Sequence, residues 1–191
     1  MKLSEISINH LSNEAVNEFL YANDIVVHGP PGMPDYEIVS GEVEFYSQDV
    51  VVRKIDEKFG VFKFPFKYSK ISFLQISGRT IESWNDFPDS AISYVFFDDC
   101  KIPSLGTIPH YASIRLGVRY DFSDNIIPLF EYGSDIYFSL YDPTNEYEIC
   151  IITKKGTGPI EIDRHTDHSK KFTDVFDFQS WLVDNGYERL T

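Results

Sequence analysis

The chain has 191 residues, of which 42% are hydrophobic and 16% aromatic, so it can build a sizeable core and is not disordered throughout. Seventeen Lys and Arg against thirty Asp and Glu give a formal net charge of −13. This excess of acid argues against nucleic-acid binding, because phosphate contacts need Lys and Arg, and it favours a basic protein partner. Two cysteines, Cys100 and Cys150, are too few for a disulfide framework.

Nothing in the sequence marks the chain for a membrane or for export. No apolar run approaches the roughly 20 residues of a transmembrane helix, and residues 1–12 lack the apolar core of a signal peptide. We therefore expect a cytoplasmic protein without membrane contacts.

The first predicted element is a helix that begins after Ser12. The hydroxyl of Ser12 can accept one of the unpaired N–H groups of the first turn. Apolar residues then recur at i, i+3 and i+4 on one face: Val16, Phe19 and Leu20. Asn23 and Asp24 predict the end of this helix.

A short strand and an irregular loop follow the helix. Residues 25–27 predict the strand, and the segment 28–34 holds three prolines and two glycines, which excludes regular structure. From Ile38 onward, β-branched and aromatic residues dominate and predict a β-rich body.

Two neighbouring blocks of equal length, 71–91 and 92–112, share a pattern. They are identical at six matched positions: Ile71/Ile92, Ser72/Ser93, Ile81/Ile102, Ser83/Ser104, Pro88/Pro109 and Ala91/Ala112. A third block that begins at Ser113 is weaker, and residues 61–70 resemble a degraded earlier copy. The alternative is chance similarity between two adjacent arches of an ordinary sheet.

The spacing within each block resembles the leucine-rich repeat pattern, and the length of the blocks lies within that pattern's range of periods. Apolar residues occupy positions 1, 4, 6 and 11, and position 9 holds Cys100 in the second block. In that pattern, position 9 satisfies backbone groups at the bend after the strand. Arg79 stands there in the first block and Asp121 in the third. Short strands are predicted over 73–76 and 94–97.

We expect a single α+β domain over 1–191 that contains a short leucine-rich-like repeat stack. A free-standing solenoid needs about three or more repeats, and this chain has two clear ones. The predicted parts are a helical start with a Pro/Gly loop (1–34), a repeat-like β region (50–125), and a β-meander with a closing helix (126–191).

The last third predicts three strands and a helix. The strands lie over 136–140, 148–152 and 159–162. Asp177 is expected to cap the helix and Gly186 to end it, since a left-handed glycine commonly follows a helix. The apolar stripe of this helix comprises Phe178, Trp181 and Leu182.

Three short segments in this third match a known family: Ile127-Pro128-Leu129, Gly133-Ser134-Asp135-Ile136, and Val175-Phe176-Asp177-Phe178 with Trp181-Leu182. On these segments, residues 126–186 resemble the closing half of the SUKH superfamily, best known as bacterial toxin-immunity proteins. The resemblance implies an immunity role.

Catalytic and metal-binding patterns are weak. Asp163, His165, Asp167 and His168 have metal-ligand chemistry, but no second His/Cys cluster accompanies them, so we favour a solvated loop and expect no metal or other cofactor. Cys100 follows two aspartates that raise a thiol pKa, the opposite of what a reactive cysteine needs. We expect no catalytic residues, and a metal-dependent hydrolase is kept as the second alternative.

Charge and aromatic residues point to protein binding instead. The span 85–148 holds eleven acids and three bases, so it carries eight of the thirteen net negative charges. In the strand of the second block, Val95 and Phe97 point one way, and Tyr94 and Phe96 point the other. Either these two rings form a partner-binding patch, or a helix or loop covers them.

We therefore predict a non-enzymatic inhibitor that resembles an immunity protein and occludes a basic partner such as a bacterial toxin. Its predicted contact residues are Tyr94, Phe96, Asp98, Asp99, Tyr120, Asp121 and Asp124. The first alternative is a phage or mobile-element accessory protein that binds a host target through the repeat surface.

Overall fold

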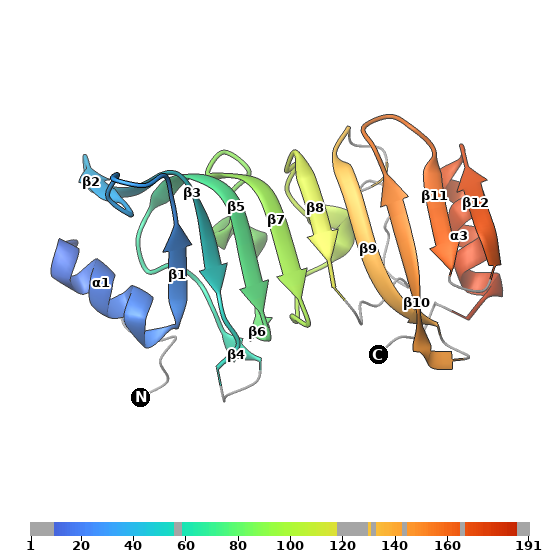
Figure 1. The fold of residues 1–191 in the computed structure, drawn as a ribbon, viewed down its shortest axis with the longest axis horizontal. Coiled ribbons are helices and arrows are strands. Elements are labelled where there is room, and N and C mark those ends of the chain that lie inside the picture. The colour runs from blue at the N-terminus through green and yellow to red at the C-terminus, as the bar shows by residue number, and fades with distance from the viewer. Residues whose placement is uncertain are drawn as a thin grey trace. The chain divides into compact units, whose positions relative to one another are not determined.

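A computed structural model describes residues 10–55, 59–117, 130, 133–142, 145–164 and 167–186. The chain has the predicted α+β class, with an N-terminal helix, a strand-rich body of stacked coils and a C-terminal helix (Figure 1). It divides into two compact units, Met1–Pro103 and Ser104–Thr191. Whether these units form one domain stays a prediction. No helix in the described part of the chain is long and apolar enough to cross a membrane.

Unit 1 begins with the helix α1 (Asn13–Ala22). The Ser12 hydroxyl accepts a hydrogen bond from the backbone N–H of Ala15 at 3.2 Å, as expected of an N-cap. The buried residues of α1 are Val16, Phe19 and Leu20. After the helix, Asp24 adopts a positive φ of 51° and the chain turns into the strand β1 (Ile25–His28). The predicted helix and its apolar face are therefore confirmed.

Three parallel strands form the centre of unit 1: β3 (Glu42–Val52), β5 (Tyr68–Ser77) and β7 (Ile92–Asp98). β1 and β2 (Glu37–Val39) both pair with β3 in antiparallel fashion. A second, two-stranded ladder joins β4 (Gly60–Val61) to β6 (Arg79–Thr80) in parallel. After a strand the chain makes a corner, passes through the second ladder and returns, so successive coils stack.

The period of the two sequence blocks is confirmed as a stacking register. Ile71 pairs with Ile92, and the same offset relates Leu74 to Val95 and Ile76 to Phe97. The side chains at these six positions are buried between the strands and the return segments. Residues that correspond in the two sequence blocks thus occupy equivalent places in neighbouring coils.

The preceding coil stacks on the next one, but its residues do not pair at the block period. Val50 pairs with Leu74, an offset longer than the block period, whereas Gly60 pairs with Arg79, an offset shorter than that period. The strand of this coil is β3, so the predicted earlier copy at 61–70 holds the end of β4, the return segment and the first residues of β5. Register shifts in β3 around Gln48 accompany the change of spacing.

Equivalent corners follow β5 and β7. Gly78 and Asp99 stand one block period apart, and both adopt left-handed backbone, with φ of 64° and 49°. The backbone N–H of Gly78 donates to the carbonyl of Asp98 at 2.9 Å, which ties one corner to the next.

The position after each corner is buried and bonded to backbone, as the repeat pattern predicts. The Cys100 thiol donates to the carbonyl of Ile76 at 3.2 Å. In the coil before, Nη2 of the fully buried Arg79 donates to the carbonyls of Asn23 and Arg53, each at 3.0 Å. The Arg79 side chain, like that of Cys100, thus donates hydrogen bonds to backbone carbonyls, and its greater length lets it reach carbonyls of more distant segments. Asp121, predicted for this position in the third block, lies outside the described residues.

Aromatic rings fill the interior of unit 1. Phe19 of α1 lies 5.5 Å from Phe66 and 6.3 Å from Phe62 between ring centroids. Phe97 of β7 lies 5.6 Å from Trp84, which belongs to the 3-10 helix η2 (Trp84–Asp86). The helix, the return segments and the strands are therefore held by one continuous set of ring contacts.

The described residues of unit 2 form the 3-10 helix η3, five strands and the helix α3. Their bounds are η3 (Leu105–Thr107), β8 (Ser113–Leu116), β9 (Asp135–Asp142), β10 (Asn145–Lys154), β11 (Ile160–Arg164), β12 (Asp167–Phe172) and α3 (Val175–Asp184). β8 pairs with β9 in parallel, and β9 to β12 form an antiparallel meander. Phe178 of α3 lies 5.0 Å from Phe130 and 5.9 Å from Phe172, which packs the helix on this sheet.

Two predictions for unit 2 are wrong in detail. The helix is capped by Asp174, whose Oδ1 accepts from the N–H groups of Phe176 and Asp177 at 2.8 and 3.2 Å. Asp177 therefore lies in the first turn. The segment 163–168 is predicted as a loop because it is polar, but β11 extends to Arg164 and β12 begins at Asp167. These two strands pair, and an ion pair of 2.7 Å joins Lys171 of β12 to Glu161 of β11.

Candidate functional site

The outward face of β7 carries the two aromatic residues that the sequence places there. Tyr94 is 47% exposed and Phe96 is partly exposed, whereas Val95 and Phe97 are 1% and 0% exposed. The alternation of side chains along the strand produces this division. Tyr94 and Phe96 therefore lie on the surface of unit 1, and neither a helix nor a loop seals Tyr94 from solvent.

The parallel register sets further side chains beside these rings. Phe73 of β5 is paired with Tyr94, and Asp49 of β3 is paired with Phe73. In the next row, Gln75 of β5 is paired with Phe96. We call the set Asp49, Phe73, Tyr94, Phe96 and Asp98 the outward face.

Acidic residues bound the rings of the outward face. Asp98 continues the outward alternation of β7 and is partly exposed, and Asp49 is exposed. Neither carboxylate forms an ion pair with a side chain that the structure describes. Asp99 follows at the left-handed corner, next to the face. The other predicted contact residues, Tyr120, Asp121 and Asp124, lie outside the described part of the chain.

Phe73 and Asp49 were not predicted as site residues. The repeat could have predicted that Phe73 lies beside Tyr94, because the two residues occupy the same position in their blocks. Asp49 could not be found in this way, since β3 pairs with β5 at a different offset.

The acidic residues of the span 85–148 do not all gather on the outward face. Asp86 lies in η2, between β6 and β7, and lines a groove among the return segments. Asp135 belongs to β9 of unit 2, where its carboxylate accepts from the N–H of Gly156 at 2.9 Å. The net charge of the span is therefore not a measure of the charge on this face.

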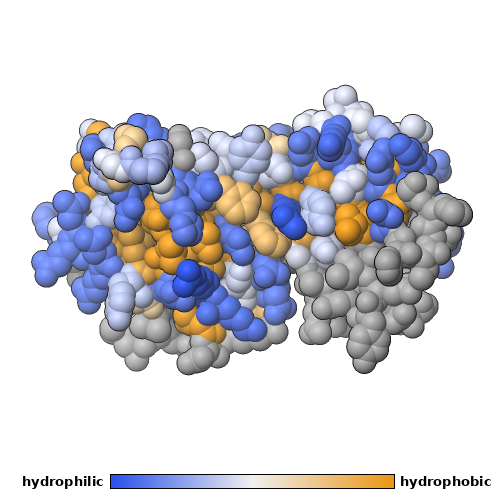
Figure 2. Space-filling model, in the orientation of Figure 1, coloured by the Kyte–Doolittle hydropathy of each residue, from blue (hydrophilic) through white to orange (hydrophobic). Residues whose placement is uncertain are grey.

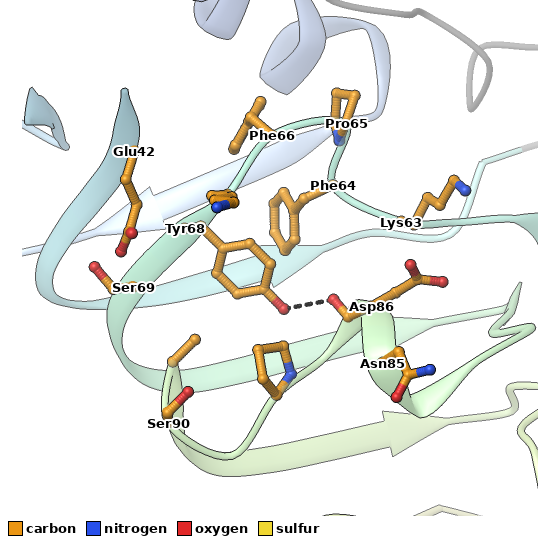
Figure 3. Close-up of a pocket in the computed structure, with 13 residues that line it drawn as sticks. Glu42, Lys63, Phe64, Pro65, Phe66, Tyr68, Ser69, Asn85, Asp86 and Ser90 are labelled. Atoms are coloured by element: carbon orange, nitrogen blue, oxygen red, sulfur yellow. Dashed lines mark hydrogen bonds between the residues drawn. The ribbon is translucent and has the colours of Figure 1, made fainter. Parts of the chain in front are cut away.

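A groove of about 710 Å³ opens between two return segments of unit 1. Figure 3 shows the rings of Phe64 and Tyr68 between polar side chains on either side. The Tyr68 hydroxyl donates to the carbonyl of Asp86 at 2.8 Å and so links the two segments. The residues that line the groove are Glu42, Lys63, Phe64, Pro65, Phe66, Lys67, Tyr68, Ser69, Asn85, Asp86, Pro88, Ser90 and Ala91.

Cys100 has the environment of a core thiol. It is buried, and burial, with a smaller contribution from Asp98, raises its pKa from 9.0 to about 11. Nucleophilic chemistry requires the thiolate, which is scarce at neutral pH when the pKa is raised. The direction agrees with the sequence argument, although burial is a larger cause than the neighbouring acids.

Lys154 is a buried amine in unit 2 beside a small pocket of about 180 Å³. Burial lowers the pKa of Lys154 below its ordinary value, and Asp135 opposes this change. The Lys154 ammonium donates to the carbonyl of Gly156 in the turn after β10. This hydrogen bond stabilises that turn.

Among the described residues, no group of three His, Cys, Asp or Glu side chains is arranged to hold a metal ion. His165 and the side chain of His168 lie outside what the structure describes, and the metal-dependent hydrolase stays a prediction. Comparison of the chain with protein-family models, curated proteins and solved structures finds no match in any of the three.

Proposed function

We propose that the protein is a non-enzymatic binding protein that occludes a basic protein partner through the outward face of unit 1. The observation that carries this proposal is the register that sets Phe73 beside Tyr94, with Phe96 one row further along β7. Figure 2 shows apolar and hydrophilic side chains close together on the side of the molecule that it draws.

Aromatic rings on a rigid sheet are suited to be anchors of an interface. They bury large areas with few rotatable bonds, and such residues dominate the binding energy of many complexes. Tyr94 is one of the few large hydrophobic residues that are exposed in the described part of the chain, and its backbone is held by the ladder to β5. The loss of conformational entropy when a partner binds this face is therefore small.

The acids at the margin of the outward face favour a positively charged partner. Asp49 and Asp98 flank the rings without forming ion pairs to described side chains. Charges at the rim of an interface speed association more than they add affinity, and salt screens them. We therefore expect a partner with Lys or Arg residues around an apolar patch.

A bacterial toxin is the partner class that we favour. The resemblance of residues 126–186 to SUKH immunity proteins supports this choice. A phage or mobile-element protein that binds a host target would use the same face. The identity of the bound partner distinguishes the two.

The experiment is a binding measurement by biolayer interferometry against a panel of purified basic toxin domains. At least one should bind, with an association rate that falls at least tenfold between roughly 50 and 300 mM salt. The double variant Tyr94→Ala/Phe96→Ala should weaken binding by at least tenfold, because each hot-spot ring contributes about 2 kcal/mol or more. Tyr21→Ala is the matched control, since Tyr21 is 90% exposed on α1, away from the face.

Two outcomes contradict the proposal. One is that no basic domain binds at either salt concentration. The other is that Tyr21→Ala and the Tyr94→Ala/Phe96→Ala variant bind the partner equally well.

A further inference from the structure

The groove of unit 1 is a second surface, and the proposed function does not use it. It lies between two segments of successive coils: residues 63–69, a return segment with the first residues of β5, and the return segment 85–91. We call it the return groove. Its volume of about 710 Å³ falls within the range of roughly 300–1,000 Å³ that is typical of sites for small organic ligands.

The apolar wall of the return groove is built from packed aromatic and proline side chains. The rings of Phe64 and Tyr68 lie 4.4 Å apart, and Phe66 lies 5.6 Å from Phe64. Pro65 adds an apolar ring from the same segment, and Figure 3 shows Phe64 and Tyr68 at the centre of the view. Because Tyr68 is also bonded to the carbonyl of Asp86, this wall is held in place before any ligand arrives.

The polar groups around the groove are of mixed kind and carry no net charge. The lining holds two lysines, Lys63 and Lys67, and two acids, Glu42 and Asp86. None of these four side chains forms an ion pair with another side chain in the described ranges. The hydroxyls of Ser69 and Ser90 and the amide of Asn85 complete the polar lining.

We propose that the return groove binds a neutral oligosaccharide. A strongly charged ligand of either sign meets two like charges in the lining, so the balance of Lys63 and Lys67 against Glu42 and Asp86 disfavours it. A sugar hydroxyl both donates and accepts, and it can therefore pair with an ammonium, a carboxylate, an amide or a serine. The C–H faces of sugar rings are apolar and fit an aromatic and proline wall.

An extended peptide fits the groove less well. A peptide strand needs a row of backbone donors and acceptors on the protein, as an open sheet edge provides. The groove instead offers side chains, and Pro65 and Pro88 bring no backbone N–H to it. A polyhydroxylated ligand is thus the class that uses both the apolar wall and the mixed polar lining.

The test uses the full chain and three neutral trisaccharides, namely chitotriose, cellotriose and maltotriose. Saturation-transfer NMR detects contact with the protein, and titration calorimetry gives the affinity. At least one trisaccharide should bind with a Kd at or below roughly 1 mM. Asp86→Ala should weaken that binding by at least tenfold, because it removes a carboxylate from the lining. Asp89→Ala is the control, since Asp89 is an exposed acid nearby that does not line the groove.

Phe66→Ala tests the apolar wall and should abolish the saturation transfer from the protein to the sugar C–H protons. If that variant does not fold by circular dichroism, Asp86→Ala still decides the question, because Asp86 is partly exposed. The proposal is overturned if none of the trisaccharides shows transfer at roughly 10 mM, where even a Kd of 1 mM is saturating. It is equally overturned if Asp86→Ala and Asp89→Ala bind alike. Because Tyr94→Ala leaves the groove intact, a failure here is separate from a failure of the outward face.

Discussion

Two neighbouring phenylalanines on β7 provide a direct test of which side of the strand is the interior. Phe97 is fully buried, with its ring 5.6 Å from Trp84 and 6.3 Å from Phe87. Phe96 is the next residue back along the chain, points to the outward face and is partly exposed. The substitutions Phe96→Ala and Phe97→Ala remove the same atoms from opposite sides of one strand.

The two variants should differ strongly in stability. Removing a fully buried phenylalanine costs about 3–5 kcal/mol, because the apolar transfer energy is lost and a cavity remains. Phe97→Ala should fall in this range, since its ring is 0% exposed and touches two other rings. Full burial of such a side chain is worth about 1.5–3 kcal/mol, so the partly exposed Phe96 should cost about 1 kcal/mol or less.

Urea unfolding followed by tryptophan fluorescence measures the difference. The chain has two tryptophans, and Trp181→Phe leaves Trp84, the neighbour of Phe97, as the sole reporter of unit 1. Both alanine variants should be made in this background. Equal losses for Phe96→Ala and Phe97→Ala would mean that the outward face is covered, which contradicts the exposure of Phe96.

Two further predictions concern the corners of the coils. Gly78→Ala should destabilise the chain by about 1–2 kcal/mol, because an alanine at φ 64° is strained and its Cβ would lie 2.9 Å from Cγ of Lys54. Urea midpoints of the variant and the parent chain measure the loss, and an unchanged midpoint contradicts the corner geometry. In a Cys150→Ser background, the Cys100 thiol should react with a disulfide reagent at pH 8 about 100-fold more slowly in the folded than in the unfolded chain, since burial raises its pKa from 9.0 to about 11. Because the thiol ionises at a lower pH in the unfolded chain, the contribution of the buried neutral thiol to the free energy of unfolding is present below pH 9 and is lost as the pH rises to about 11. Equal reaction rates in the folded and unfolded chain would contradict the burial of this thiol. The same holds if Cys100→Ala does not change the loss of stability at high pH.

Local signals in the sequence predict much of the fold. Ser12 and the apolar spacing after it define α1, because a cap and an amphipathic face are properties of a few adjacent residues. The period that matches Ile71 to Ile92 also predicts their pairing, since stacked coils place equivalent residues side by side. The cap of α3 was misplaced because Asp174 and Asp177 both suit that position, and only the backbone decides between them.

The rest depends on how distant segments meet. β3 pairs with β5 so that Val50 lies opposite Leu74, at an offset longer than the block period. No spacing in the sequence predicts this offset. The return groove likewise needs Tyr68 and Asp86 to come together from successive coils, so its polar and apolar residues do not form a motif along the chain. Tyr94 and Phe96 were predictable because one strand suffices to place them on one side.

Hydroxyl-radical footprinting of the protein, free and bound to its basic partner, shows whether the partner covers the outward face. The oxidation rate of a side chain reports its exposure, and Tyr94 and Tyr21 are both exposed in the free chain, at 47% and 90%. We expect that oxidation of Tyr94 falls severalfold in the complex while that of Tyr21 stays the same. An unchanged rate at Tyr94 in a complex that has formed would contradict it.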